Sequence, residues 1–559
     1  MPIPERARRV LPQRGAAAVA VAAPRSMLAP AMPPSPRARV RRSGPRGALL
    51  GIAGALLGAL GASAAHAQGR YESALLGGRS ALLGGTGVVL GVDGAAPFLN
   101  PATIIRIEDR NIAFSSAFFR YAHRTLEAWH QPGPVDAALY GDLRLDRATV
   151  TDQGLDSLPD ATCYFFDVKR GARDAEPRRA RVGRQTFAAC LAKTEENEFG
   201  FDALRFSGQS ASRRVNQAQT FRYAWGRFSA GPSWSYRATE RLAVGVSLSA
   251  VRTRYTSALD VASLVEDTGT GAASSVTYQA ALSGDSWDGL AHLGATYRLS
   301  PVFSAGLSVR TPSVHLFDSL DASHHDTRAT GTAAVRTWAG EGEFVAPSPA
   351  RLAVGASAEW SRLRLELDGF FYLGQREFAR ASVDREEIAV DGGAVTSRRR
   401  SRLDLVEGAA PIVNVGLGAE VFLTRDLSLL GGAVTDFNAL SGLRGPMSAE
   451  SKLFLERMSG VHASLGLVSY TRFGDLVFGA RFDYAAGQMA AVNAFASPVR
   501  LDPIDCREIG ATLVLAGRIS LRTVEDVARE IGDAVEGSAA PPPERATPRE
   551  PMRAPAQED

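Results

Sequence analysis

The chain has 559 residues, a formal net charge of +4 and a hydrophobic content of 45%. This length and apolar content exclude a globally disordered chain and are sufficient for one large domain or for several. A positive net charge is compatible with a nucleic acid or an anionic surface as partner. Whether the charge supports either partner depends on where it lies along the chain.

Residues 1–67 have the three parts of a secretory signal peptide. The first 46 residues hold ten arginines and one acidic residue. An uncharged apolar run follows at 48–60, and the small residues Ala65 and Ala67 place the cleavage site after Ala67. The alternative is a membrane anchor, but the run is short and Gly-rich for a span. The basic part is long, so we expect the true start at Met32 or Met27.

Removal of this segment changes the charge of the protein. The remaining chain has 53 basic and 58 acidic residues, a net charge of −5. The basic balance therefore belongs to the exported precursor, and we expect no nucleic-acid partner for the mature protein.

Residues 68–109 are apolar, Gly-rich and aperiodic, as in Leu75–Ala102. This segment is too apolar to remain in water and too irregular to form a strand. It needs a cavity in which to be buried, and the lumen of a barrel would provide one.

Period-two alternation recurs along residues 110–521. In 242–250, the even positions are Leu, Val, Val, Leu and Ala, and the odd positions are Ala, Gly, Ser and Ser. Such alternation predicts a strand with one apolar face and one small or polar face. Similar segments occur at 292–299, 303–310, 352–360, 363–368, 413–421, 476–483 and 512–521. We predict an all-β fold, a transmembrane outer-membrane β-barrel of roughly 14 antiparallel strands.

The connections between these segments support a barrel. Short polar turns alternate with long polar stretches, as periplasmic turns alternate with outer loops. The long stretches are 260–274, 318–348, 376–410 and 438–458. A soluble β-sandwich also alternates, but aromatic residues near predicted strand ends, such as Trp225, Trp360 and Tyr484, favour interfacial girdles. Strands are unclear over 130–220, where we expect a long inserted loop or a small subdomain.

Cysteine and histidine patterns predict little site chemistry. Cys163 and Cys190 could close a loop in an oxidising compartment, which would leave Cys506 unpaired. No Cys/His spacing indicates zinc, and His324-His325-Asp326 fits an exposed loop better than a metal site. We expect neither a metal nor a cofactor.

The chain continues after the last predicted strand, which ends at Leu521. Residues 522–559 are interpreted as a periplasmic tail. The spacing of Val524, Val527, Ile531 and Val535 predicts a short amphipathic helix over 522–536. The rest is rich in Ala, Pro and Glu and is expected to be disordered.

The N-terminal segment resembles the hatch of the outer-membrane long-chain fatty-acid transporters (FadL type), which include relatives for toluene and hydrocarbon uptake. The resemblance rests on Gly84-Gly-Thr-Gly87, Val92-Asp-Gly-Ala-Ala96 and Asn100-Pro101-Ala102, and on turn-and-strand patterns at 230–245, 297–312 and 347–355. It covers roughly 70–521 and is weakest over 130–220. It implies a 14-stranded barrel plugged by its own N-terminus, with release of hydrophobic ligands through a side opening in the wall.

The resemblance also implies which residues bind or gate the ligand: Phe98, Leu99, Asn100, Pro101, Ala102, Ile104 and Ile105. We expect Asn100 to hold the hatch to the wall by side-chain hydrogen bonds. Phe98, Leu99, Ile104 and Ile105 would line an apolar pocket. The alternative is that Asn100-Pro101 only forms a turn.

The expected function is transport of hydrophobic compounds, such as fatty acids or hydrocarbons, across the outer membrane of a Gram-negative bacterium. Its surroundings would be outer-membrane lipid and lipopolysaccharide, with the protein as a monomer. A structural or secretion-associated barrel that anchors other proteins, and a general porin, are the alternatives. We expect no enzyme, since His292 is predicted to face the lumen but has no assignable nucleophile.

Overall fold

The computed structural model describes residues 70–74, 76–107, 110–127, 129, 148–155, 160–167, 182–209, 212–330, 332–440, 447–448, 456–493 and 500–537. The predicted signal peptide, the connections at 130–147 and 168–181, and the Ala/Pro/Glu-rich end of the tail lie outside these residues.

Strands dominate the described chain. The strands are β1 (Asn111–Leu126), β2 (Ala148–Leu155), β3 (Ala161–Asp167), β4 (Gln185–Gln209), β5 (Arg213–Arg237), β6 (Leu242–Asp267), β7 (Ala273–Arg298), β8 (Phe303–Arg310), β9 (Val314–Thr330), β10 (Thr332–Phe344), β11 (Arg351–Glu359), β12 (Leu363–Tyr372), β13 (Gln375–Asp391), β14 (Ala394–Ala409), β15 (Ile412–Phe422), β16 (Leu427–Asp436), β17 (Met447–Ser448), β18 (Glu456–Thr471), β19 (Gly474–Asn493) and β20 (Arg500–Ser520). The helices are α2 (Arg79–Leu82), α3 (Ala96–Leu99), the 3₁₀ helix η1 (Pro101–Arg106) and α4 (Leu521–Gly537).

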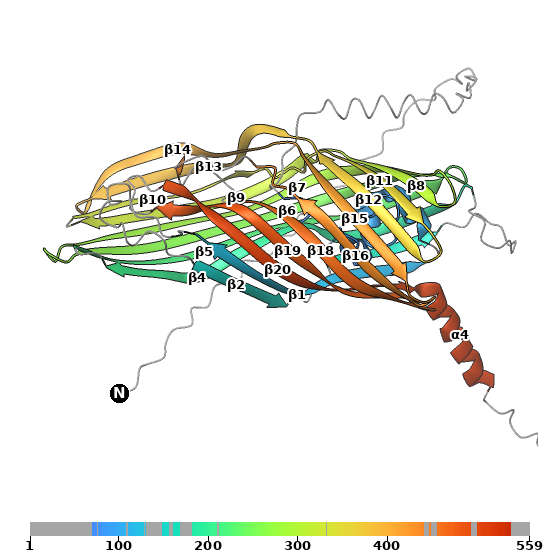
Figure 1. Ribbon diagram of the computed structural model, residues 1–559. Coiled ribbons are helices and arrows are strands. Elements are labelled where there is room, and N and C mark those ends of the chain that lie inside the picture. The colour runs from blue at the N-terminus through green and yellow to red at the C-terminus, as the bar shows by residue number, and fades with distance from the viewer. Residues whose placement is uncertain are drawn as a thin grey trace, which may run out of the picture. The chain divides into compact units, whose positions relative to one another are not determined.

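These strands form one closed antiparallel barrel (Figure 1). Five wall strands are interrupted and consist of two pieces each: β2 with β3, β8 with β9, β10 with β11, β12 with β13, and β14 with β15. With the two-residue β17 not counted, the wall then has fourteen strands in the described chain, and pairing of β1 with β20 closes it. The predicted fold class is confirmed.

The two faces of a wall strand exchange their polarity along its length, as β6 shows. Over its first nine residues the outward side chains are apolar, and Leu248 is 57% exposed. The inward ones, such as Ser247, are buried. Further along, the inward positions become apolar and buried, as at Tyr255 and Leu259, while Arg254 and Asp260 point outward. About nine to eleven residues suffice for a tilted strand to cross a bilayer. The outward apolar side chains at this end of the strands form a band, here called the apolar belt, and the rest of β6 extends past it.

This exchange of polarity explains why part of the sequence prediction is wrong. The stretches 318–348 and 376–410, expected as long polar connections, are largely strand in β9, β10, β13 and β14. Beyond the belt the outward face is polar, so the apolar alternation that marks a membrane strand disappears. His324-His325-Asp326 accordingly lies in β9 and not in a loop. Trp225, expected in a girdle, is buried inside the barrel at 1% exposure.

The region 130–220 also contributes to the wall. Its described residues form β2, β3, β4 and the start of β5, and they show no separate subdomain. Cys163 on β3 and Cys190 on β4 are cross-strand partners joined by a disulfide, with a Cα–Cα distance of 4.2 Å. Cys506 is free and buried.

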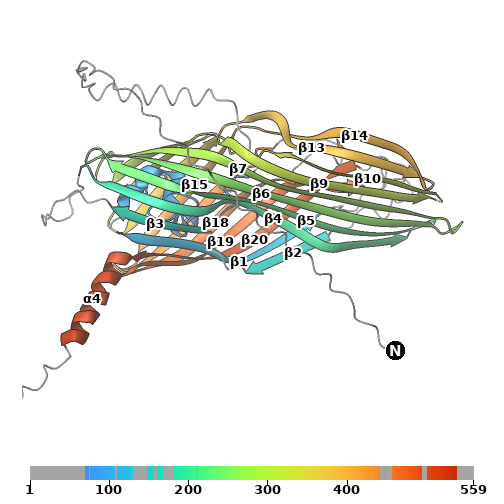
Figure 2. The same cartoon turned by 180° about the vertical axis from the view of Figure 1, so that it is seen from behind.

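Residues 70–107, the hatch, lie inside the barrel (Figure 2). Hatch backbone atoms form hydrogen bonds with side chains of strands all around the wall, from β5 and β6 through β11, β12, β16 and β18 to β19 and β20. Helix α4 follows β20 where the sequence predicts a helix. No helix among the described residues has the length and apolar content of a membrane span.

Candidate functional site: the hatch and the chamber beside it

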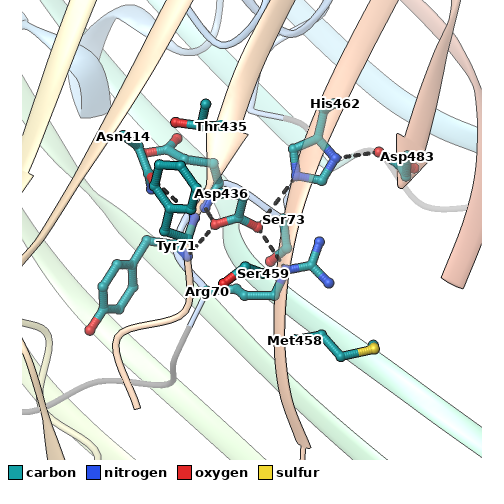
Figure 3. A network of polar contacts seen from close by, with 12 residues as sticks. Arg70, Tyr71, Ser73, Asn414, Thr435, Asp436, Met458, Ser459, His462 and Asp483 are labelled. Atoms are coloured by element: carbon teal, nitrogen blue, oxygen red, sulfur yellow. Dashed lines mark hydrogen bonds and ion pairs between the residues drawn. The ribbon is translucent and has the colours of Figure 1, made fainter. Parts of the chain in front are cut away.

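The first residues of the hatch are held by one carboxylate on β16 (Figure 3). Asp436 accepts hydrogen bonds from Arg70 Nε at 2.9 Å and from the backbone N–H groups of Tyr71 and Glu72, both at 3.0 Å. His462 on β18 lies between two carboxylates, with its Nε2 3.3 Å from Asp436 Oδ2 and its Nδ1 in contact with Asp483. A single buried acid therefore satisfies two backbone donors and one cation, which fixes the path of the chain where the hatch begins.

A second pair of carboxylates holds the middle of the hatch. Asp368 accepts the N–H groups of Gly87 and Val88 at 2.9 and 3.0 Å. Glu366, two residues earlier on β12 and on the same inward face, accepts those of residues 89 and 90 at 2.6 and 3.1 Å. This stretch has no regular secondary structure, so its donors need side-chain partners when it is buried.

Asn100 connects two parts of the hatch with the wall. Its side-chain N–H₂ donates to the carbonyl of Val88 at 2.6 Å and to that of Ala295 on β7 at 3.2 Å. Its side-chain oxygen accepts the N–H of Ala102 at 3.1 Å and so caps η1, which Pro101 opens. Both polar atoms of the amide are used, in three hydrogen bonds, in line with a tether as well as a turn.

Wall glycines admit the Asn-Pro-Ala segment at close range. Gly245 and Gly294 are cross-strand partners on β6 and β7. A Cβ at Gly294 would lie 1.9 Å from Asn100 Oδ1, and one at Gly245 would lie 2.4 Å from the carbonyl carbon of Pro101. Alternation of small residues on the inward face is therefore what lets the hatch contact the wall backbone directly.

A cavity of about 60 Å³, here called the chamber, lies between the hatch and the wall. Hatch residues Glu72, Phe98 and Leu99 line it together with wall residues His292, Arg310, Arg351 and Tyr372. The hydroxyl group of Tyr372 donates a hydrogen bond to Glu72 Oε1, with an O–O distance of 2.6 Å. Burial raises the pKa of the Glu72 carboxyl to about 7, against the opposing effect of Arg351. The chamber is thus polar and rich in cations, with two apolar side chains of the hatch on its wall.

The barrel interior beyond the chamber is apolar and aromatic. Trp225, Tyr255 and Phe344 are each at most 2% exposed. The rings of Tyr255 and Phe344 stack with centroids 5.8 Å apart, and Trp225 packs edge-on against Phe344 at 6.3 Å. They belong to one large cluster of buried apolar residues from many strands. Water-exposed strands thus enclose an apolar interior outside the predicted membrane belt.

The structure brings some of the expected site residues to the chamber and leaves others away from it. Phe98 and Leu99 line the chamber. Ile104 is fully buried among Phe98 and wall residues of β1, β3 and β4, and Ile105 lines a different space beside Val89. Pro101 and Ala102 pack against the wall. Their roles in binding or gating stay predictions.

Arg310 and Arg351 belong to no recognisable motif of the sequence. Arg310 ends an alternating segment on its polar side, which predicts an inward side chain, but nothing in the sequence shows that Arg351 lies directly beside it. Their cross-strand pairing depends on the register between β8 and β11. His292, which the sequence predicts to face the lumen, does so at 3% exposure.

Comparison with known proteins finds similarity in solved structures alone. No family model matches the sequence, and no curated protein matches it. The Ralstonia pickettii toluene transporter TbuX is 16% identical, with coverage of 80% of this chain and 99% of that one and a TM-score of 0.42. A Pseudomonas aeruginosa FadL homologue is 13% identical, with coverage of 82% and 100% and a TM-score of 0.45. The P. putida toluene transporter TodX is 14% identical, with coverage of 81% and 99% and a TM-score of 0.47.

Proposed function

We propose that this protein is an outer-membrane channel of a Gram-negative bacterium that takes up hydrophobic compounds, such as long-chain fatty acids or hydrocarbons. The observation that carries this proposal is the apolar, aromatic interior of the barrel beyond its apolar outer belt. A water-filled pore would need polar walls at that level. An apolar solute gains about 0.8 kcal/mol for each CH₂ group that it buries in such an interior.

The hatch gives the channel its gate. It occupies the lumen and is held by discrete hydrogen bonds to Asp436, Asp368, Glu366 and Ala295. A small shift of the hatch would exchange some of these bonds and enlarge the chamber, which now admits roughly four water-sized groups. An obstructed lumen of this kind supports selective uptake over a general porin.

An irregular part of the wall is the candidate exit. The pairing of β1 shifts register between Ala117 and Phe119, and β4 shifts between Lys193 and Glu195. Asp160 lies between them, where it accepts the N–H of Ala117 at 2.5 Å and pairs with Lys193 at 3.3 Å. A space of about 50 Å³ lies beside these residues and is lined by residues of the hatch and of the wall, most of them polar or charged. We infer that ligands leave sideways here, into the membrane.

The proposal includes the molecules that surround the protein. The outward apolar belt contacts lipid, and the exposed arginines Arg398, Arg399 and Arg400 on β14 contact lipopolysaccharide. We propose that the barrel functions as a monomer and that its role is passage of a solute and not catalysis.

Uptake measurements test the proposal. A strain that lacks the gene should lose uptake of labelled oleate or of hydrocarbons, and the wild-type gene should restore it. Leu259→Asp would place an unpaired charge in the apolar interior and should abolish this rescue. The matched control is Ala258→Asp, the neighbouring position on the outer face, which should rescue fully. Equal rescue by both variants would contradict a route through the interior.

A further inference from the structure

Three basic side chains form a row at the level of the chamber. His292 on β7 is the cross-strand partner of Arg310 on β8, and Arg310 is the partner of Arg351 on β11. All three point inward and are more than nine-tenths buried, with exposures of 3%, 9% and 5%. Like charges directly opposite one another destabilise a sheet, so this placement opposes folding unless something compensates it.

The surrounding protein supplies little compensating charge, because the acid that lines the same chamber, Glu72, is itself buried and has a pKa raised to about 7. Neither Arg310 nor Arg351 forms an ion pair with a carboxylate of the described residues. Arg310 donates to the carbonyl of Pro349 at 3.3 Å, and Arg351 donates to those of Phe98 and Leu99 at 2.8 and 3.4 Å. Carbonyl oxygens carry only partial charge, and the Glu72 carboxyl forms an ion pair with neither guanidinium, so the two buried cations are incompletely compensated.

Three polar atoms of this row also have no hydrogen-bond partner among the described residues. Arg310 Nη2, Arg351 Nε and His292 Nδ1 are buried and form no hydrogen bond in the described chain. All three residues line the chamber. Arg310 Nη2 and Arg351 Nε can only donate, whereas His292 Nδ1 donates in one tautomer of the neutral ring. An unsatisfied buried donor costs free energy, so two of them beside one cavity indicate a missing acceptor.

We propose that His292, Arg310 and Arg351 form a binding site for an oxyanion, the carboxylate of an amphiphile or a free anion, and that the bound anion competes with the hatch for Arg351. Guanidinium groups suit a carboxylate because they offer parallel N–H donors and full charge. The chamber has room for such a head group, while an alkyl tail would extend toward the aromatic interior. The tail's location rests on the proposed function, whereas the anion site does not.

Arg351 gives the site its coupling to the hatch. The same guanidinium that would bind the anion now holds the carbonyls of Phe98 and Leu99, immediately before Asn100. An anion would offer it a stronger, charge-assisted hydrogen bond. Occupation of the site would thereby free this end of α3 and favour movement of the hatch, so binding and gating would share one residue.

The experiment compares ligands that differ in one group. Full-length protein in amphipol is titrated with dodecanoate, dodecanol and acetate, and amide hydrogen exchange is followed over residues 96–103. We expect dodecanoate to bind at least tenfold more tightly than dodecanol and to accelerate exchange, since a charge-assisted hydrogen bond is worth about one to two powers of ten. Acetate binding as tight as that of dodecanoate would identify a free anion as the occupant.

Variants separate the site from the channel. Arg310→Gln should lower dodecanoate affinity about tenfold or more, leave dodecanol affinity unchanged and suppress the ligand-induced exchange. Arg351→Gln should accelerate exchange without any ligand. Arg252→Gln, on the outer face of β6, is the control and should behave as wild type. Equal affinities for dodecanoate and dodecanol in wild type, or a normal response in Arg310→Gln, would overturn the proposal. Absence of dodecanol binding with retained acetate binding would contradict only the proposed channel.

Discussion

The side chain of Asn100 makes three hydrogen bonds, and their loss should loosen the hatch without opening the barrel. Replacement by Ala removes the bonds to Val88, Ala295 and Ala102. At about 0.5–1.5 kcal/mol each, the loss amounts to roughly 3 kcal/mol, or about a hundredfold increase in the population of open hatch. Hydrogen exchange over residues 87–103 measures this increase, and heat-modifiable gel mobility shows that the barrel is intact.

Asn100→Asp distinguishes a tether from a turn. Asp and Asn cap helices equally well, so a residue that only caps η1 would tolerate the change. A tether would not, because the carboxylate loses both donations and faces the carbonyl oxygens of Val88 and Ala295. Asn438→Ala is the matched control, since Asn438 also donates to a carbonyl and accepts an N–H, but outside the hatch. Wild-type exchange in Asn100→Asp would refute the tether.

Three further predictions concern the fit, the belt and the charge of the site. Gly294→Ala should displace the hatch and accelerate its hydrogen exchange, because the new Cβ would lie 1.9 Å from Asn100 Oδ1. Leu248→Arg should destabilise the barrel in lipid by about 2–4 kcal/mol in urea titrations, while Thr256→Arg, outward on the same strand beyond the belt, should cost less than about 1 kcal/mol. Burial raises the pKa of Glu72 to about 7, so the N-terminal end of the hatch is held best below pH 5 and progressively less as pH rises through 7. Glu72→Gln should remove this dependence from hydrogen exchange at the Asp436 anchor, after correction for intrinsic rates.

Local alternation was enough to predict the barrel but not the length of its strands. The outward Leu, Val, Val and Leu of 242–248 mark a lipid-facing strand, and this signal is independent of tertiary structure. Past Val251 the apolar residues change to the inward face, and Arg252 and Arg254 face water. Polar composition there resembles a loop, although the strand continues to Asp267. Only contacts with the other strands show that the inward residues enclose an interior.

Only the part of the candidate site that lies in one continuous stretch of sequence could be predicted. Residues 98–102 stand out because an apolar, Gly-rich segment needs burial and Asn-Pro-Ala is a recognisable motif. The basic row is different, because Arg310 and Arg351 are adjacent through the register of two wall strands and through inward rotation of both side chains. No spacing within one chain segment encodes that register. The anchor Asp436 could not be predicted for the same reason, since its partner Arg70 is more than three hundred residues away.

The position of the basic row explains why the hatch and a ligand would exclude each other. On one side of it lie the small inward residues that contact the hatch, and on the other lies the interior built around Trp225, Tyr255 and Phe344. An amphiphile whose tail fills that interior would place its head at Arg310 and Arg351. Without a ligand, the carbonyls of the hatch give Arg351 its only acceptors among the described residues. The guanidinium of Arg351 cannot donate to these carbonyls and at the same time form bidentate hydrogen bonds with a carboxylate. Binding of the ligand would therefore weaken the contact that keeps the hatch closed.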